Sequence, residues 1–158
     1  SRTLARAFCV ALLRFSPDAG ATTVAARLAA QGAVADIRAV NCTFSVYTTG
    51  TWRDGRSQAE VLPSTLAVQF EAINVDEGTA RAIGDYGPSD IIVRLSTGTL
   101  HLLQAFSAGP LYLTTIFPKQ TTSGRLQAVH TRHELTAVTL PGFTSKPEQY
   151  YGECEPRK

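Results

Sequence analysis

The chain has 158 residues, 44% of them hydrophobic, which indicates one globular domain with a core of its own. A net charge of +2, with basic residues scattered along the chain, argues against nucleic acid or an anionic membrane surface as a partner. No apolar run approaches the roughly 20 residues that a transmembrane helix requires, so no transmembrane segment is expected.

The N-terminal region has helical periodicity. Apolar side chains fall on one stripe of Thr3–Phe15, and arginines project away from it. A second, alanine-rich helix is expected over Thr22–Gln31, with Gly32 just past its end. Two alternatives remain for the first segment. It is either a packed amphipathic helix or a targeting segment that is retained.

The rest of the chain shows the alternation of apolar and polar residues that is typical of strands. Leu66, Val68, Phe70 and Ala72, for example, fall on one face of a strand. The polar stretch 52–57 is expected to be a loop or hairpin tip, and the glycines and proline of 84–89 are expected to stop pairing. The predicted strands are 37–50, 65–72, 79–82, 91–95, 100–103, 111–116, 126–135 and 149–154.

Several of these strands have apolar residues on both faces, most clearly in Ile91-Ile92-Val93. A sheet with one solvent-exposed face is not expected to have apolar residues on both faces. The sheet is therefore either covered by a helix or closed on itself. The prediction is a mainly β fold in a single domain, 1–158. N-terminal helices occupy 1–32, and 36–154 forms an antiparallel up-and-down β-barrel, or strongly curled sheet, of about seven or eight strands. In outline this resembles the calycin-like carriers, as a fold-level analogy only.

Three cysteines, Cys9, Cys42 and Cys154, bear on closure of the barrel and on compartment. Cys42 lies in the first predicted strand and Cys154 in the last, and these strands are neighbours in an up-and-down barrel. A Cys42–Cys154 disulfide would therefore fasten the closure; the alternative is three buried thiols. Asn41-Cys42-Thr43 matches the N-glycosylation triplet, which together with a disulfide favours a secretory route.

The densest polar cluster is 130–134, which contains His130, Arg132 and His133. On a strand, His130 and His133 point to opposite faces, so a shared metal ion is not expected. His130 and Arg132 share a face. If that face points into the barrel, an imidazole and a guanidinium would bind a carboxylate or enolate there. The alternative is a solvated strand near the barrel mouth.

Further candidate ligand contacts lie at the expected rim of the barrel. Asp85 and Tyr86 fall in an irregular loop of the kind that often contacts ligands. The aromatic residues Trp52, Tyr47, Tyr112, Tyr150 and Tyr151 form a possible recognition set, although such residues also close the ends of cores. The chain has no phosphate-binding loop, nucleophile elbow or Cys-x-x-Cys motif, so no catalytic residue or cofactor is predicted.

The sequence therefore predicts a non-enzymatic binding protein, a small barrel that holds an apolar or weakly acidic small molecule. A first alternative is a structural or interaction subunit with a self-filled barrel, which docks on a partner protein through the N-terminal helix or the tyrosine-rich C-terminal tail. A second alternative is a cofactor-free isomerase or cyclase that uses His130 or His133 with Arg132 and a carboxylate at the barrel rim.

Overall fold

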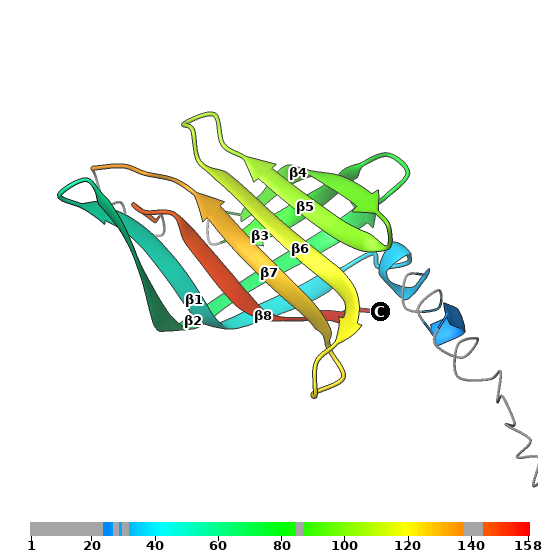
Figure 1. Ribbon diagram of the computed structural model, residues 1–158. Helices are drawn as coiled ribbons and strands as arrows, with labels where there is room; N and C mark the ends of the chain where they lie inside the picture. Colours follow the sequence, from blue (N-terminus) through cyan, green and yellow to red (C-terminus); the bar gives the residue numbers. More distant parts are fainter. Residues whose placement is uncertain (1–23, 27–28, 30–31, 85–86, 138–143) are drawn as a thin grey trace, which may run out of the picture.

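The protein is a closed ring of eight antiparallel strands, each paired with the next along the chain, with β8 returning to pair with β1 (Figure 1). The computed structural model describes residues 24–26, 29, 32–84, 87–137 and 144–158. The strands are β1 (Val40–Arg53), β2 (Arg56–Asn74), β3 (Thr79–Gly84), β4 (Gly87–Ser96), β5 (Thr99–Ala105), β6 (Leu111–Gln120), β7 (Leu126–His133) and β8 (Glu148–Pro156). The predicted up-and-down barrel is confirmed.

The interior of the ring is filled by the apolar side of each strand. Alternate residues are buried along β5 and β6, as the two-residue period of a strand requires. The largest apolar side chains that are fully buried on the strands are Phe44, Ile73, Leu100, Leu102 and Ile116. Burial of each such side chain contributes roughly 1.5–3 kcal/mol to stability.

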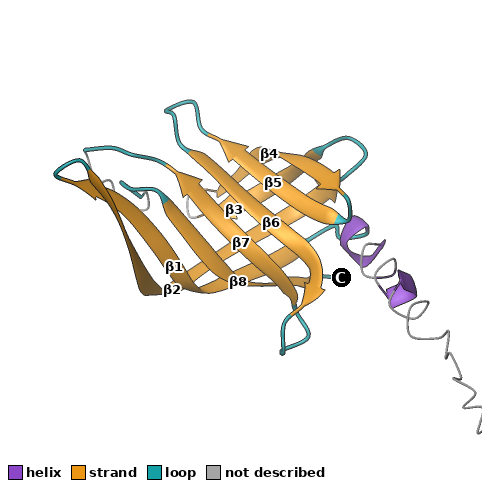
Figure 2. Ribbon diagram, in the orientation of Figure 1, coloured by secondary structure: helices purple, strands orange, loops and turns teal. Residues whose placement is uncertain are grey.

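One end of the barrel is closed by the segment that precedes β1. Residues 24–26, 29 and 32–35 are helical, and this segment stands beside the end of the barrel where β1 begins (Figure 2). Val34 and Ile37 are buried in the same core cluster as β1 and β2. The expectation that the helix stops before Gly32 is wrong, because residues 32–35 are helical and place Val34 against the core. The helix predicted over Thr3–Phe15 lies outside the described residues.

β1 and β2 form a longer hairpin than the sequence suggests. The tip is a two-residue turn, Asp54-Gly55, in which both residues have positive φ, as a tight hairpin turn requires. The predicted hairpin tip is confirmed, but β2 starts at Arg56, although 56–64 has no apolar alternation to predict a strand. β2 pairs with β3 only over Gln69–Asn74. In the part of the chain that the structure describes, the opposite edge of 56–68 therefore has no partner strand.

The predicted stop at 84–89 is also wrong. β3 and β4 stay paired up to Gly84 and Gly87, and Pro88 lies opposite Ile83. The N–H of Val93 in β4 donates to the carbonyl of Gly78, and the N–H groups of a strand point to alternate sides, so the nitrogen of Pro88 faces away from β3. β5 pairs with β4 only from Ile92 onward, so the missing N–H of Pro88 removes no ladder hydrogen bond.

A bulge near the end of β2 changes the predicted face of Ala72. The register with β3 shifts between Glu71 and Asn74, and Ala72 has a φ of 51°. The extra residue turns Ala72 to solvent and turns Ile73 into the core. The backbone N–H of Ile73 donates to the carbonyl of Arg38, which ties this bulge to the segment that closes the barrel.

Candidate functional site

The second end of the barrel, its mouth, is lined by polar and aromatic side chains. Three hairpins, β1–β2, β3–β4 and β5–β6, and the β7–β8 connection lie at this end. By strand alternation and contact, seven inward-facing residues gather there, and we call them the mouth cluster: Tyr47 and Thr49 from β1, Tyr112 from β6, His130 and Arg132 from β7, and Glu148 and Tyr150 from β8.

His130 is at the base of the mouth cluster and is only 4% exposed. Its Nε2 lies 3.2 Å from Nε of Arg132, which can only donate, so Nε2 must accept. The proton of the neutral ring is therefore on Nδ1, which donates to the hydroxyl of Thr114 at 2.8 Å. Burial, with a smaller effect from the Arg132 charge, lowers the pKa of His130 to about 3. At neutral pH His130 is an uncharged ring with both nitrogens engaged.

Arg132 presents a guanidinium that is held between two tyrosine rings. Its central carbon lies 4.9 Å from the ring centroid of Tyr112 and 5.3 Å from that of Tyr150. Such contacts contribute roughly 0.5–2 kcal/mol each. Among the described residues, no carboxylate lies within 4.0 Å of this guanidinium, and its two terminal nitrogens have no hydrogen-bond partner. The terminal nitrogens of Arg132, which are the atoms that best recognise planar oxyanions, therefore have no partner in the part of the chain that the structure describes.

Two carboxylates accept hydrogen bonds from these tyrosines. The hydroxyl of Tyr150 donates to Glu148 at 2.5 Å, and that of Tyr112 donates to Glu134 at 3.5 Å. Burial raises the pKa of both phenols, and for Tyr150 the bond to Glu148 adds to the effect. Glu148 lies opposite Arg132 in the β7–β8 register but turns towards Tyr150. Both tyrosines are thus fixed as neutral donors.

The cluster also contains a buried hydroxyl that lacks a partner. Oγ1 of Thr49 is buried and makes no hydrogen bond. Thr49 is on the same face of β1 as Tyr47 and lies opposite Glu148 in the β1–β8 register. The Tyr47 ring stacks on Tyr150 at 4.9 Å. A buried hydroxyl without a partner costs about 1–3 kcal/mol, so a ligand that bonds to Thr49 would recover stabilisation.

The predicted site residues separate into three groups. His130 and Arg132 face inward and are in direct contact. His133 is exposed, as expected from its position on the other face of β7, and Trp52 is 57% exposed on the overhanging β1–β2 hairpin. Asp85 and Tyr86 lie outside the described residues.

The structure also divides the five aromatic residues that the sequence grouped together. Tyr47, Tyr112 and Tyr150 surround His130 and Arg132, whereas Trp52 and Tyr151 face outward. Strand alternation places Tyr150 on the same face of β8 as Cys154, but Tyr47 reaches the inner face only because the extra residue Ser45 shifts the alternation of β1. Thr49 and Glu148 were not predicted, because nothing in their local sequence marks them.

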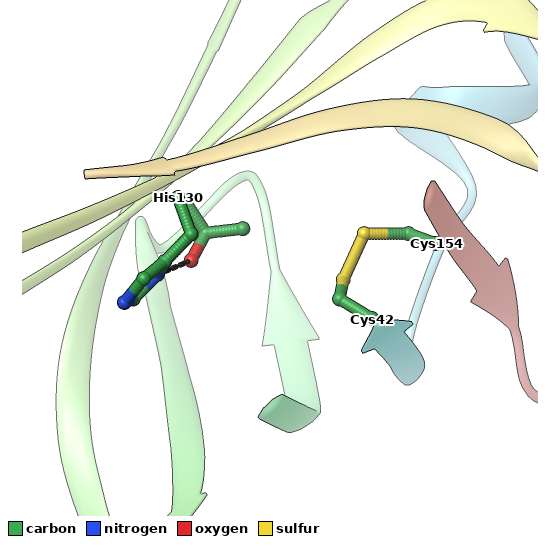
Figure 3. The surroundings of a disulfide bond; sticks show 4 residues. Cys42, His130 and Cys154 are labelled. Carbon is green, nitrogen blue, oxygen red and sulfur yellow. Dashed lines mark hydrogen bonds between the residues drawn. A yellow bond between two sulfur atoms is a disulfide. The ribbon is translucent and has the colours of Figure 1, made fainter. Parts of the chain in front are cut away.

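The predicted disulfide joins Cys42 in β1 to Cys154 in β8, with both residues buried and directly paired across the strands. Figure 3 shows this bond in the same view as His130, whose ring is hydrogen-bonded to a hydroxyl group. Asn41, the predicted glycosylation site, lies in β1 between β2 and β8, and its Oδ1 is buried without a partner. Glycosylation of Asn41 stays a prediction.

Two further site types were searched in the described part of the chain. No group of three histidine, cysteine, aspartate or glutamate residues there is arranged to hold a metal ion. None of the helices in that part has the length and apolar character needed to cross a membrane. Comparison of the chain with protein-family models, with curated protein sequences and with solved structures found no match.

Proposed function

We propose that this protein is a non-enzymatic binding protein that holds a weakly acidic small molecule with an apolar body at the barrel mouth. The observation that supports this most directly is the guanidinium of Arg132, which lies between Tyr112 and Tyr150 and whose terminal nitrogens have no partner among the described residues. A carboxylate or enolate would bond to the terminal nitrogens, and the apolar body would lie against the rings of Tyr150 and Tyr47. An eight-stranded barrel has room for one small ligand at most.

The charges at the mouth restrict the ligand class. Arg132 is the cation of the cluster, and the carboxylates of Glu134 and Glu148 contribute two negative charges beside it. A dianion such as a phosphate monoester would meet repulsion from both carboxylates. A single carboxylate or an enolate gains the Arg132 contact with less repulsion. A polar group on the ligand can also bond to the unpartnered hydroxyl of Thr49.

The same geometry favours binding over catalysis by His130. A general base needs a free lone pair and a pKa near the working pH. Nε2 of His130 already accepts from Arg132, Nδ1 already donates to Thr114, and burial lowers the pKa to about 3. The isomerase or cyclase alternative therefore gains no support from His130.

The interaction-subunit alternative is favoured by a different observation, namely the packing of the other half of the barrel. Phe44, Leu100 and Ile116 fill that half and are at most 1% exposed. If the mouth is filled in the same way, the protein would act through a partner that docks on its N-terminal helix or tyrosine-rich tail. Native mass spectrometry separates the two, because a monomer that copurifies with a small molecule supports the binding protein.

We also infer a secretory route for the protein. The disulfide between Cys42 and Cys154 is of a kind that persists in oxidising compartments, and the triplet at Asn41 would be an acceptor there. Peptide mapping of protein from its native source would detect a glycan on Asn41, and an unmodified Asn41 would remove that part of the proposal.

The test of the main proposal is a ligand panel with a matched pair of arginine variants. Fatty acids, retinoic acid and aromatic carboxylates are titrated against the protein, with thermal shift and calorimetry as readouts. At least one carboxylate should bind, and Arg132→Met should weaken it about tenfold or more, because a charge-assisted hydrogen bond contributes roughly 1.5–3 kcal/mol. Arg53→Met, at the exposed hairpin tip, should leave the affinity unchanged.

Two results would contradict the proposal. One is that none of the carboxylates binds. The other is that Arg132→Met binds its carboxylate as tightly as the unaltered protein while remaining folded by circular dichroism.

A further inference from the structure

A second recessed surface lies on the outside of the barrel, where neighbouring strands lose register. In β8, Tyr151 and Gly152 are consecutive, but their partners in β1, Val46 and Phe44, have one extra residue between them, Ser45. An extra residue in one strand bends that strand and increases its local twist. The β1–β8 sheet is therefore bent at Ser45.

The register between β1 and β2 shifts at the same two β1 residues, and the number of extra residues is larger there. In β2, two residues, Ser64 and Thr65, separate Pro63 from Leu66, which are the partners of the same two β1 residues. Across β8, β1 and β2 the number of inserted residues thus rises from none to one to two. Both ladders continue beyond the inserted residues, so the sheet bends at this level while its strands stay paired. The β1–β2 hairpin then extends beyond the start of β8 (Figure 1).

A cleft of about 560 Å³ occupies this bend, within the range of sites for small ligands. It runs from the inserted residues of β1 and β2 to the start of the β6–β7 loop at Thr121. Most of the side chains that line it carry hydroxyl groups: Thr43, Ser45, Ser64, Thr65, Thr121 and Tyr151. None of them belongs to the mouth cluster.

One carboxylate in the cleft is held in a fixed position. Oε2 of Glu153 accepts hydrogen bonds from Thr121 and Ser123, both at 2.7 Å, and Oε1 accepts from Arg125 at 2.9 Å. These bonds from Ser123, Thr121 and Arg125 lower the pKa of Glu153, so it is ionised at neutral pH. A carboxylate has more lone pairs than these donors use, and it can still accept from a ligand hydroxyl.

We propose that this cleft binds a neutral saccharide. The Tyr151 ring, 41% exposed at the cleft, offers a flat apolar surface to a sugar face, and the surrounding hydroxyls with Glu153 match the hydroxyls at its edge. The cation beside the cleft, Arg125, is already paired with Glu153 and with Glu155 at 3.3 Å. An anionic ligand would find no unpaired cation there, whereas an uncharged polyhydroxylated ligand needs none.

The experiment uses maltotriose, cellotriose and chitotriose as probes of the full-length protein, with saturation-transfer NMR and calorimetry as readouts. We expect at least one of them to bind in the millimolar range, as is usual for a small exposed site with few contacts. Tyr151→Ala should weaken that binding about tenfold, because the stacking surface is lost. Thr65→Val, which removes an exposed hydroxyl and keeps the shape, should weaken it less.

Two variants serve as controls. Trp52→Ala removes an exposed aromatic ring outside the cleft, and Arg132→Met alters the mouth cluster, so both should bind the trisaccharide normally. Failure of all three probes to bind would overturn the proposal. So would normal binding by Tyr151→Ala, or loss of binding in Arg132→Met, which would place the sugar in the mouth instead.

Discussion

At the scale of single residues, the most informative pair is His130 and Arg132. A histidine on a strand is ordinarily a candidate acid or base, but here its partners decide its chemistry. Arg132 can only donate, so it fixes the tautomer of His130, and burial keeps the ring neutral. His130 thus holds Nε of Arg132 through this hydrogen bond, and the terminal nitrogens of Arg132 have no partner among the described residues.

This assignment predicts the behaviour of His130 in a pH titration. The imidazole carbon-bound protons of His130 should keep their chemical shifts from pH 8 to pH 5, because burial lowers the pKa to about 3. Long-range nitrogen–proton spectra should show the proton on Nδ1. A midpoint near the ordinary value of about 6.5 would show that the ring is solvated and would contradict the assignment.

The same shift sets the direction of a stability change. Since the pKa of His130 is lower in the folded than in the unfolded chain, the unfolded chain binds more protons between about pH 6.5 and pH 3. The contribution of the neutral His130 ring to the free energy of unfolding is therefore complete above pH 6.5, and it is lost progressively as the pH falls towards 3. Urea unfolding at pH 7 and pH 5 should show this loss, and His130→Gln should reduce it.

At the scale of elements, irregular pairing between strands shapes both candidate sites. The inserted residues Ser45, Ser64 and Thr65 line the outer cleft, and the β1–β2 hairpin extends past the mouth because its ladder continues to Arg53 after pairing with β8 has ended at Thr49. β8 tolerates the bend only because Gly152 lets the two backbones approach. A Cβ on Gly152 would lie 2.0 Å from the carbonyl oxygen of Thr43.

Gly152→Ala should therefore be strongly destabilising. The atoms that the new methyl group meets belong to the backbone of Thr43 and Phe44, which cannot move aside as a side chain can. Overpacking of this kind costs about 1–3 kcal/mol or more, measurable as a lower urea midpoint. Gly84→Ala is the matched control in β3, since its Cβ would meet nothing within 4 Å. Equal stability of the two variants would show that β8 can shift away from β1.

At the scale of the whole molecule, closure of the ring depends on one pairing between the first and last strands. β1 and β8 are joined by their ladder and by the Cys42–Cys154 disulfide, whose residues are 112 positions apart. The two barrel ends differ: Val34 and Ile37 close one, and the polar mouth cluster lies at the other. The mouth cluster therefore lies above a closely packed apolar core.

Removal of the disulfide should weaken the barrel without changing its topology. For a loop of this length the chain-entropy estimate is about 4 to 5 kcal/mol, so Cys42→Ala/Cys154→Ala should unfold at a markedly lower urea concentration. Reduction of the unaltered protein under denaturing conditions should add about 2 Da for the one bond. An unchanged unfolding midpoint in the double variant would mean that the β1–β8 ladder alone determines closure.

Local patterns in the sequence were sufficient to predict an antiparallel barrel of about seven or eight strands. Period-two alternation in β5 and β6 and turn residues at regular spacing together predict an antiparallel barrel. The apolar residues on both faces of Ile91-Ile92-Val93 do not report closure, because Ile92 is 44% exposed on the outside of the barrel. The partnership of Cys42 with Cys154 followed from the order of the strands. These features are local because, within a regular segment of strand, the direction of a side chain depends only on its position along that strand.

Register and contact were decided only by the tertiary structure. Ala72 and Ile73 exchange faces through a bulge, and Ser45 and Ser64 produce a cleft, because inserted residues are counted against a partner strand that is distant in sequence. The surroundings of the Arg132 guanidinium, the engaged nitrogens of His130 and the unpartnered hydroxyl of Thr49 depend on residues from β1, β6, β7 and β8. The sequence by itself predicted the inward face of regular strand segments, whereas bulges changed that face locally and closure of the ring determined which inward residues meet, because a hydrogen bond or a ring contact requires two side chains within a few ångströms of each other.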